Sequence, residues 1–174
     1  MVYYCYGTSP SIELKDVNLQ LDSLQKAAQS WNDLVKLIKM RGNGDQHKEK
    51  LVFIVNCFGI SLAQLFGQND PFPTHGKRYP IKILKDILAN HSEIDHDETC
   101  HIESMYEEFN GFYNAGHHFG KLKHKKIDGL TVEKLDDFRR LTIKIWDIVC
   151  GVFLFDENGT KHSVAEVVYF SGLD

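Results

Sequence analysis

The chain has 174 residues, of which 43% are hydrophobic and 25% are charged, and its formal net charge is −4. This length suits one domain with a hydrophobic core and is short for two. The composition is that of an ordinary globular protein, and the net charge argues against wholesale nucleic-acid binding, because domains that bind nucleic acid usually carry a basic excess. The longest apolar run, residues 148–155, is far below the ~20 residues that a membrane helix needs, so no membrane span is expected.

The N-terminal segment and the cysteines indicate a reducing compartment. "MVYYCYGTSP" has neither a basic start nor a long apolar run, so we expect no secretory signal. No CxxC pair is present, which favours buried, reduced thiols over disulfides or a zinc knuckle. We therefore expect a cytoplasmic protein. The cysteines are Cys5, Cys57, Cys100 and Cys150.

Helical periodicity dominates the first half of the chain. Apolar residues at three- and four-residue steps predict a long helix from about Asp16 to Met40, which the glycines of "GNGD" at 42–45 would end. The same spacing predicts a second helix from about His47 to Phe66. Residues 68–80, "QNDPFPTHGKRYP", hold three of the four prolines and predict a loop. The loop is longer than a bundle turn requires, so it is a candidate functional loop.

The second half repeats the helical pattern. A short helix is predicted at 81–89, and a long helix is predicted to begin near Asp95–Asp97, where acidic residues suit the positive end of the helix dipole. A fifth helix follows "KKIDGL", with Thr131 as its N-cap. Residues 162–170, "HSVAEVVYF", are rich in β-branched and aromatic residues and predict a strand, paired with "MVYYCY" at the N-terminus.

These elements predict an all-α fold, a single-domain helical bundle over 1–174 with four to five main helices and a possible small terminal β-pairing. Residues 1–15 and 156–174 are expected to be peripheral. Trp31 and Trp146 lie on apolar helix faces and are expected in the core. Asp147 would either orient a histidine or, as we favour, face outward between turns.

One polar segment stands out at the end of the fourth long helix. "YNAGHHFGKLKHKK", residues 113–126, holds three of the nine histidines and four lysines. Positions seven apart on a helix differ by only about 20°, so His117 and His124 would share a face if the helix continues past Gly120. The simplest interpretation is a solvated basic helix end, because cations favour the negative end of the helix dipole. Asn110, Tyr113, Asn114 and Lys121 fall on or beside the same stripe.

The segment resembles the motif of the HEPN superfamily, all-α proteins named for nucleotide binding in prokaryotes and eukaryotes. The family motif, "N-x-x-R-H…H", is an Arg followed after four to six residues by a His, carried on the penultimate long helix. Here Asn114 and "HHFGKLKH" match that frame, with position 117 in the Arg place, His118 as its polar neighbour and His124 as the motif His. Many family members are metal-independent RNases of toxin–antitoxin and anti-phage systems, often homodimeric.

The resemblance implies a chemistry for this segment. His124 would act as the general base or acid in an attack of the RNA 2′-hydroxyl on the adjacent phosphorus, which leaves a 2′,3′-cyclic phosphate. His117 would stabilise phosphate charge, and Asn114 would position the backbone. No metal or other cofactor is implied, and the partners would be RNA, a second copy of the chain and an antitoxin or defence protein. The RNA-binding residues would be Tyr113, His118, Lys121, Lys123, Lys125 and Lys126.

The sequence departs from the family at one position. His117 stands where the family has Arg, and an imidazole that titrates near ~6.5 carries its charge only part of the time. The departure implies a weakened or inactive nuclease, or a site that works differently. Two other classes stay open. One is a non-catalytic dimerisation or partner-binding bundle, supported by aromatics in the irregular segments (Tyr3, Tyr4, Tyr6, Phe72 and Tyr79).

The second open class is a metal-binding bundle. His91, His96 and His101 recur every five residues among acidic side chains. A five-residue step turns a helix by about 500°, so successive histidines lie about 140° apart and cannot converge on one ion from a single helix. A solvated acidic N-terminal turn is the simpler interpretation of this stretch.

Overall fold

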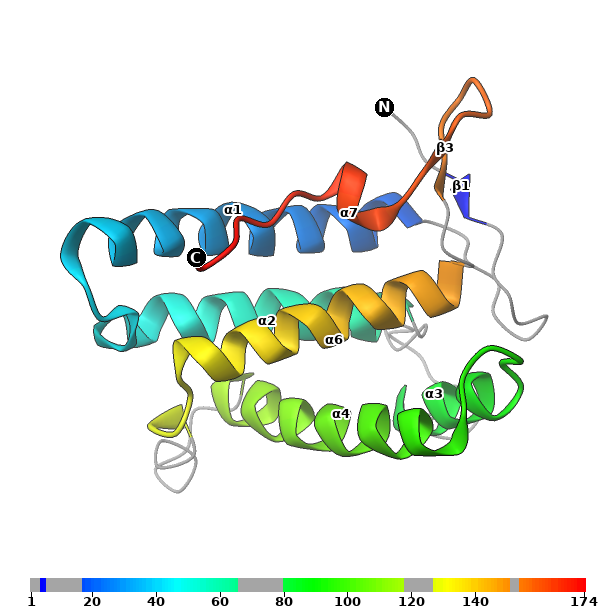
Figure 1. The fold of residues 1–174 in the computed structure, drawn as a ribbon, viewed down its shortest axis with the longest axis horizontal. Helices are drawn as coiled ribbons and strands as arrows, with labels where there is room; N and C mark the ends of the chain where they lie inside the picture. The colour runs from blue at the N-terminus through cyan, green and yellow to red at the C-terminus, as the bar shows by residue number, and fades with distance from the viewer. Residues whose placement is uncertain (1–3, 6–16, 66–79, 118–126, 151–153) are drawn as a thin grey trace.

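The computed structural model describes residues 4–5, 17–65, 80–117, 127–150 and 154–174. The described residues form four long helices. They run in alternating directions along the chain (Figure 1), so the predicted all-α bundle is confirmed. The long helices are α1 (Val17–Arg41), α2 (Lys48–Leu65), α4 (His96–His117) and α6 (Val132–Cys150). The shorter ones are α3 (Pro80–Ala89), α7 (Val164–Val167) and the 3-10 turn η1 (Gly44–Gln46).

The predicted helix ends agree with the local chemistry. The Asp95 carboxylate accepts a hydrogen bond from the Glu98 N–H (2.7 Å), which caps the start of α4. The Thr131 hydroxyl accepts from the Lys134 N–H (3.2 Å), so the predicted N-cap of α6 is confirmed. Gly42 ends α1 with φ 88°, a left-handed conformation that glycine adopts without a Cβ penalty.

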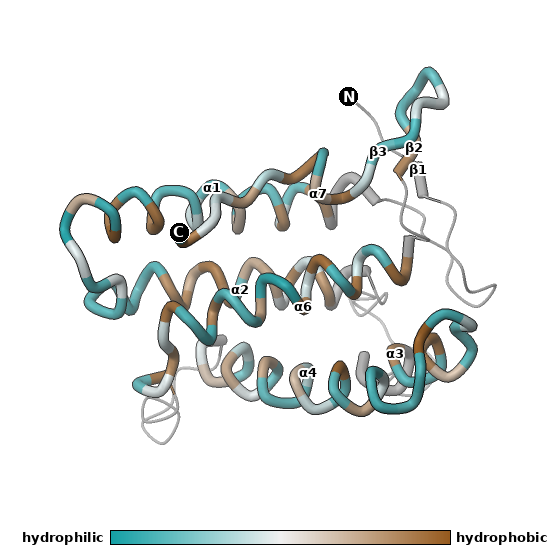
Figure 2. Tube along the Cα trace, viewed as in Figure 1, coloured by the Kyte–Doolittle hydropathy of each residue, from teal (hydrophilic) through white to brown (hydrophobic). Residues whose placement is uncertain are grey.

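The core lies between the four long helices and is rich in aromatic side chains. In Figure 2 hydrophobic and hydrophilic positions alternate along each long helix, as amphipathic helices require. Trp31 and Trp146 are fully buried, which confirms their predicted place in the core. The indole N–H of Trp146 donates to the hydroxyl of buried Ser61 on α2 (3.0 Å), so the polar atoms of both side chains are satisfied. None of the helices in the described ranges is long and apolar enough to cross a bilayer.

The small terminal sheet exists, but its pairing differs from the prediction. The N-terminal strand pairs with β2 instead of with residues 162–170, and most of that segment is not a strand. Ser163 starts α7 there through a capping box with Glu166, and this local bonding outweighs the β-propensity of the valines. The antiparallel order is β1 (Tyr4–Cys5), β2 (Leu154–Phe155) and β3 (Lys161–His162).

The turn between β2 and β3 is built around Asp156. Its carboxylate accepts hydrogen bonds from the Asn158 and Thr160 N–H groups (2.9 Å each) and lies 3.2 Å from His162 Nε2. The Thr160 N–H, followed by the His162 side chain, lowers the Asp156 pKa. Gly159 supplies the left-handed residue of the turn at φ 75°. The hairpin directs the following chain back toward α1 (Figure 1).

Beyond α7, residues 168–174 form an irregular segment, the C-terminal strap, which lies between α1 and α6. Predicted as peripheral, this end of the chain nevertheless contributes Val164 and Val168 to the buried core. The expectation of buried thiols holds for Cys57 and is wrong for Cys100, which is exposed on the outer side of α4; both are free. The predicted loop at 68–80 lies outside the described residues, except that Pro80 begins α3.

Candidate functional site

The C-terminal half of α4 is anchored to the core by a group of aromatic rings. Phe109 and Phe112 are buried, and their ring centroids lie 5.4 and 5.7 Å from that of Phe138 on α6. Tyr113 stacks on Phe109 with a centroid distance of 6.3 Å and an interplanar angle of 7°. This packing fixes the rotation of α4 about its axis and therefore decides which residues reach the surface.

α4 and α2 approach closely because glycines face the contact. A Cβ added to Gly59 would lie 2.1 Å from the Tyr113 ring, and one added to Gly116 would lie 3.1 Å from Asn56 Oδ1. Only a residue without a side chain fits at Gly59 at this helix separation. Asn56 Oδ1 is itself buried and has no hydrogen-bond partner within the described part of the chain, a cost that a packed interface rarely carries.

The described part of α4 carries the first residues of the predicted site. The helix is regular through His117, so Asn110, Asn114 and His117 recur at steps of four and three residues on one stripe. Asn114 is exposed and Asn110 half-buried. The Tyr113 ring instead packs toward α2, and burial raises its pKa. Whether it contacts RNA stays a prediction.

The rest of the predicted site lies outside the described residues. The His117 side chain and everything from 118 to 126 fall there, as does the continuation of the helix past Gly120. Their predicted roles therefore stay predictions. The residues concerned are His118, Lys121, Lys123, His124, Lys125 and Lys126.

Polar contacts hold the described residues on either side of this segment. Lys48 at the start of α2 donates to the carbonyl oxygens of Asp128 (3.0 Å) and Leu130. Lys134 on α6 pairs with Glu108 on α4. The beginnings of α2 and α6 and the latter part of α4 are thus tied together at one end of the bundle, the end at the left of Figure 1.

The opposite end of α4 gives the metal-binding alternative no support. In the described ranges, no three His, Cys, Asp or Glu side chains come close enough to hold a metal ion. His96 and Cys100 are neighbours one turn apart, with 3.7 Å between Nε2 and Sγ, and both are exposed. Asp95 is engaged as the helix cap. This stretch is an acidic, solvated helix start, as the simpler interpretation predicted.

Sequence reasoning missed a cavity between α6 and the C-terminal strap, hereafter the α6–strap cavity. It has a volume of about 530 Å³, and its apolar wall includes Ile143, Val168 and Phe170. Asp147 also lines it, with Oδ1 buried and without a hydrogen-bond partner among the residues that the structure describes. Burial raises the Asp147 pKa to about 6. Asp147, which we expected to face outward between turns, is therefore half-buried at the edge of this cavity.

The cationic side chains at the rim of the cavity are already paired. The buried carboxylate of Asp136 binds the Arg139 and Arg140 guanidinium groups at 2.7 Å each, and Lys144 pairs with Glu98 on α4. Arg139 also lies over the Trp31 ring, 5.5 Å from its centroid. Arg140 alone of the two arginines is largely exposed, at 70%. The rim therefore presents one accessible guanidinium beside an otherwise balanced set of charges.

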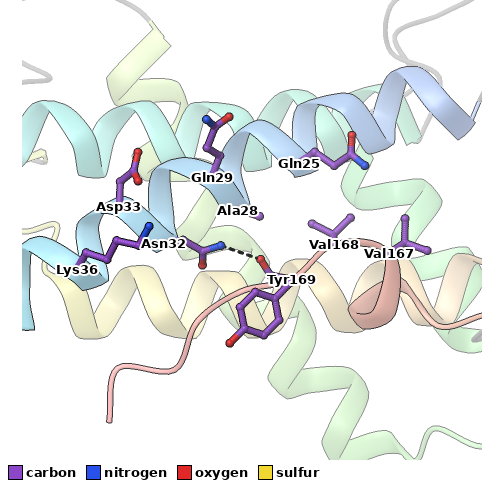
Figure 3. A pocket seen from close by; sticks show the side chains of 9 residues that line it. All are labelled: Gln25, Ala28, Gln29, Asn32, Asp33, Lys36, Val167, Val168 and Tyr169. Atoms are coloured by element: carbon purple, nitrogen blue, oxygen red, sulfur yellow. Dashed lines mark hydrogen bonds between the residues drawn. The ribbon is translucent and has the colours of Figure 1, made fainter. Parts of the chain in front are cut away.

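A second cavity of about 390 Å³ lies on the other side of the strap, against α1 (Figure 3). The Asn32 side chain joins α1 to the strap on this side. Its amide N–H donates to the Tyr169 carbonyl oxygen (3.1 Å), and its Oδ1 accepts from the Ser171 N–H (2.7 Å). The Trp31 indole donates to the Ser171 carbonyl oxygen (2.8 Å). The strap is thus held to α1 through its main chain.

No protein-family model matches this sequence, and neither the curated proteins nor the solved structures include a detectable relative.

Proposed function

We propose that the protein is a cytoplasmic HEPN-like endoribonuclease that cleaves RNA without a metal at the C-terminal end of α4. The observation that carries the proposal is the regular helix through His117 with Asn114 exposed one turn earlier. Two features of the bundle support it: α4 is the penultimate long helix, and α6 packs along it as the closing helix. The role implied is that of an RNA-directed toxin or defence protein.

The proposed reaction needs one proton acceptor and one proton donor. The RNA 2′-oxygen loses its proton to a base and bonds to phosphorus, while the bond from phosphorus to the 5′-oxygen breaks and that oxygen gains a proton. The products are a 2′,3′-cyclic phosphate and a 5′-hydroxyl. We assign the proton transfers to His124, because imidazole titrates near neutrality. Asn114 would hold a phosphate oxygen.

His117 would stabilise the phosphate charge in the place of the family Arg. A guanidinium is charged at every physiological pH and binds two phosphate oxygens at once, whereas an imidazolium is present mainly below its pKa. We therefore expect cleavage to be slow and to increase as pH falls toward ~6.5, until the base itself is protonated. His117→Arg should restore a faster reaction.

The test is cleavage of a labelled single-stranded RNA in EDTA, with the 3′ ends identified. We expect His117→Arg to cleave at least about tenfold faster than the natural chain, and His124→Ala to lose about 10²-fold or more of that activity in the His117→Arg background. His101→Ala, at an exposed histidine near the other end of α4, is the matched control and should change nothing. Cleavage by neither the natural chain nor His117→Arg, or cleavage that EDTA abolishes, would contradict the proposal.

A homodimer belongs to the proposal, because the family commonly completes its site by pairing two motif-bearing helices. Light scattering of the purified chain should give twice the mass of the 20.0 kDa monomer. An antitoxin or defence partner would bind over the same end of α4. Its addition should inhibit cleavage.

A non-catalytic partner-binding bundle is the second candidate function. One observation favours it: the α6–strap cavity is open and partly apolar, and none of the residues that line it belongs to the predicted RNA site. The two candidates are separable, because loss of RNA cleavage and loss of partner binding would follow from variants in different helices.

A further inference from the structure

An oblique row of four residues crosses the outward side of α2, with neighbouring members three positions apart. Neighbouring Cβ atoms in such a row lie about 5–6 Å apart, and each step shifts the position by about 60° around the helix axis. The row therefore leads from the contact with α4 round to the surface. Phe53 is 49% exposed, whereas Phe58, which faces the core from the same helix, is fully buried. The row consists of Lys50, Phe53, Asn56 and Gly59.

This row leads toward the predicted RNA site. Gly59 lies against the Tyr113 ring on α4. Asn56, one turn earlier on α2, lies beside Gly116, one turn later on α4. The two helices are therefore antiparallel, and Phe53, a further turn earlier, lies nearer the C-terminal end of α4. Figure 1 shows the same arrangement, because α2 begins at the end of the bundle where α4 ends.

The exposed members of the row supply three contacts that one nucleotide can make. An exposed phenylalanine ring can stack on an unpaired base, a common mode of single-strand recognition. Asn56 is half-buried although its Oδ1 atom is enclosed beside α4, which leaves the amide N–H group as a donor at the surface. Lys50 lines a cavity of about 580 Å³ at the start of α2, and its ammonium group can bind a phosphate as a point charge.

A single donor beside a stacking ring distinguishes purines from pyrimidines. Adenine and guanine both present the N7 acceptor, and the pyrimidines have no ring nitrogen in that place. A purine also offers the larger face for stacking on Phe53. The combination of Phe53 and Asn56 therefore favours an unpaired purine.

We propose that the Lys50–Phe53–Asn56 row of α2 is the base-binding half of the RNA site and selects single-stranded RNA with an unpaired purine. Phe53 stacks on the purine, the Asn56 amide N–H donates to its N7, and Lys50 binds the adjoining phosphate. This inference rests on the proposed function, because the row holds the strand that the end of α4 would cleave. The roles proposed for α4 concern phosphate and ribose, so α2 supplies the recognition of a base.

The test measures binding separately from cleavage. The probe is a labelled 2′-O-methyl oligouridylate with one central adenine, which the proposed reaction cannot cleave because its 2′-oxygen carries no proton. Fluorescence anisotropy with the full chain should show at least about fivefold tighter binding than with the all-uridine oligonucleotide. Replacing the adenine by 7-deazaadenine keeps the rings but removes the N7 acceptor, and should weaken binding about threefold.

Two variants assign these effects to the side chains of the row. Phe53→Ala should weaken binding of the adenine probe at least about fivefold. Tyr169→Ala, which removes the exposed aromatic ring of the strap, is the matched control and should change the affinity by less than about twofold. Asn56→Ala should bind the adenine and 7-deazaadenine probes equally, a result that a purely structural role of Asn56 would not produce.

Absence of binding, or equal affinity for the adenine, 7-deazaadenine and all-uridine probes, would overturn the proposal, and this comparison needs no variant to fold. Equal effects of Phe53→Ala and Tyr169→Ala would also overturn it. So would a dimer of the free chain that Phe53→Ala converts to a monomer, because the exposed ring would then belong to a contact between two copies.

Cleavage separates this inference from the proposed function. RNA cleavage by His117→Arg without any purine preference in binding would leave the nuclease proposal intact and reject the α2 row alone. Purine-dependent binding that Phe53→Ala weakens, with cleavage by neither form of the chain, would support the row and reject the nuclease.

Discussion

The α2–α4 contact and the α1–α6 contact solve the same packing problem in opposite ways. At the first, Gly59 lets the Tyr113 ring fill the space, and the two helices meet directly. At the second, the strap fills the gap between the helices and leaves cavities of about 390 and 530 Å³ on its two sides. Helices that meet directly close off a surface, whereas helices separated by an extended segment leave one that can still take a ligand.

The two contacts also differ in whether a ligand could reach the unsatisfied polar atom that each contains. Asn56 Oδ1 is enclosed between α2 and α4, where a ligand has no room. Asp147 Oδ1 borders the α6–strap cavity, where a donor can reach it. The first atom is a cost of close packing, and the second is available for binding.

The largest expected effect tests whether the core around α4 is packed more tightly than the strap. Phe138→Ala removes a ring in contact with Phe109 and Phe112, and we expect it to lower the free energy of unfolding by about 3–5 kcal/mol. Phe170→Ala in the strap is the matched control, and its half-buried ring should cost only about 1–2 kcal/mol. Urea unfolding of both measures the difference, and equal losses would contradict the comparison.

Gly59→Ala tests the close approach of α2 and α4. Alanine normally stabilises a helix interior by about 1 kcal/mol relative to glycine. Here its Cβ would overlap the Tyr113 ring, so we expect a net loss of about 2 kcal/mol. In a chain that already carries Tyr113→Ala, adding Gly59→Ala should cost little stability, because the ring that its Cβ would overlap is gone. A stabilised Gly59→Ala single variant would show that the helices have room to separate.

Asn32→Ala tests the hold of α1 on the strap. It removes two hydrogen bonds to the strap main chain, and we expect a loss of about 1.5 kcal/mol together with faster hydrogen exchange of the Ser171 amide. Gln29→Ala, one turn earlier and exposed, should be neutral within about 0.5 kcal/mol. An unchanged Ser171 amide in Asn32→Ala would show that packing alone holds the strap.

The smallest effect concerns the pH dependence that Asp147 imposes. Its folded pKa of about 6 lies above the ordinary value of 3.8, so its contribution to stability falls as pH rises from about 4 to about 6 and is constant above. Asp147→Asn should therefore be more stable than the natural chain at pH 7, by about 1 kcal/mol because the group is only partly buried, and nearly equal at pH 4. Thermal unfolding at the two pH values measures this, and a difference independent of pH would contradict it.

Local sequence signals predicted the helices well. Apolar periodicity located α1 and α2 to within a residue or two. Thr131 marked the start of α6 and Gly42 the end of α1. The cysteine prediction was less successful, since nothing local distinguishes exposed Cys100 from buried Cys57.

Features that depend on distant contacts were not predictable in the same way. Residues 162–170 have β-propensity, but the Ser163–Glu166 capping box and the Asp156 turn decide their structure. The α6–strap cavity depends on bonds from Trp31 and Asn32 to residues about 140 positions away, which no periodicity encodes. Asp147 within an apolar stretch was the one available signal. For the proposed RNA site, the sequence supplied the motif and α4 the positions through His117.

Ultraviolet crosslinking of the chain to a single-stranded RNA, followed by mass spectrometry of the crosslinked peptides, tests the central claim most directly. Our account predicts crosslinks within residues 113–126, at the end of α4, and their loss in a chain with Lys121, Lys123, Lys125 and Lys126 all changed to Gln. Crosslinks confined to α6 and the strap, around Arg140 and Tyr169, would contradict it. They would assign nucleic-acid binding to the α6–strap cavity. Absence of any crosslink would remove RNA from the account.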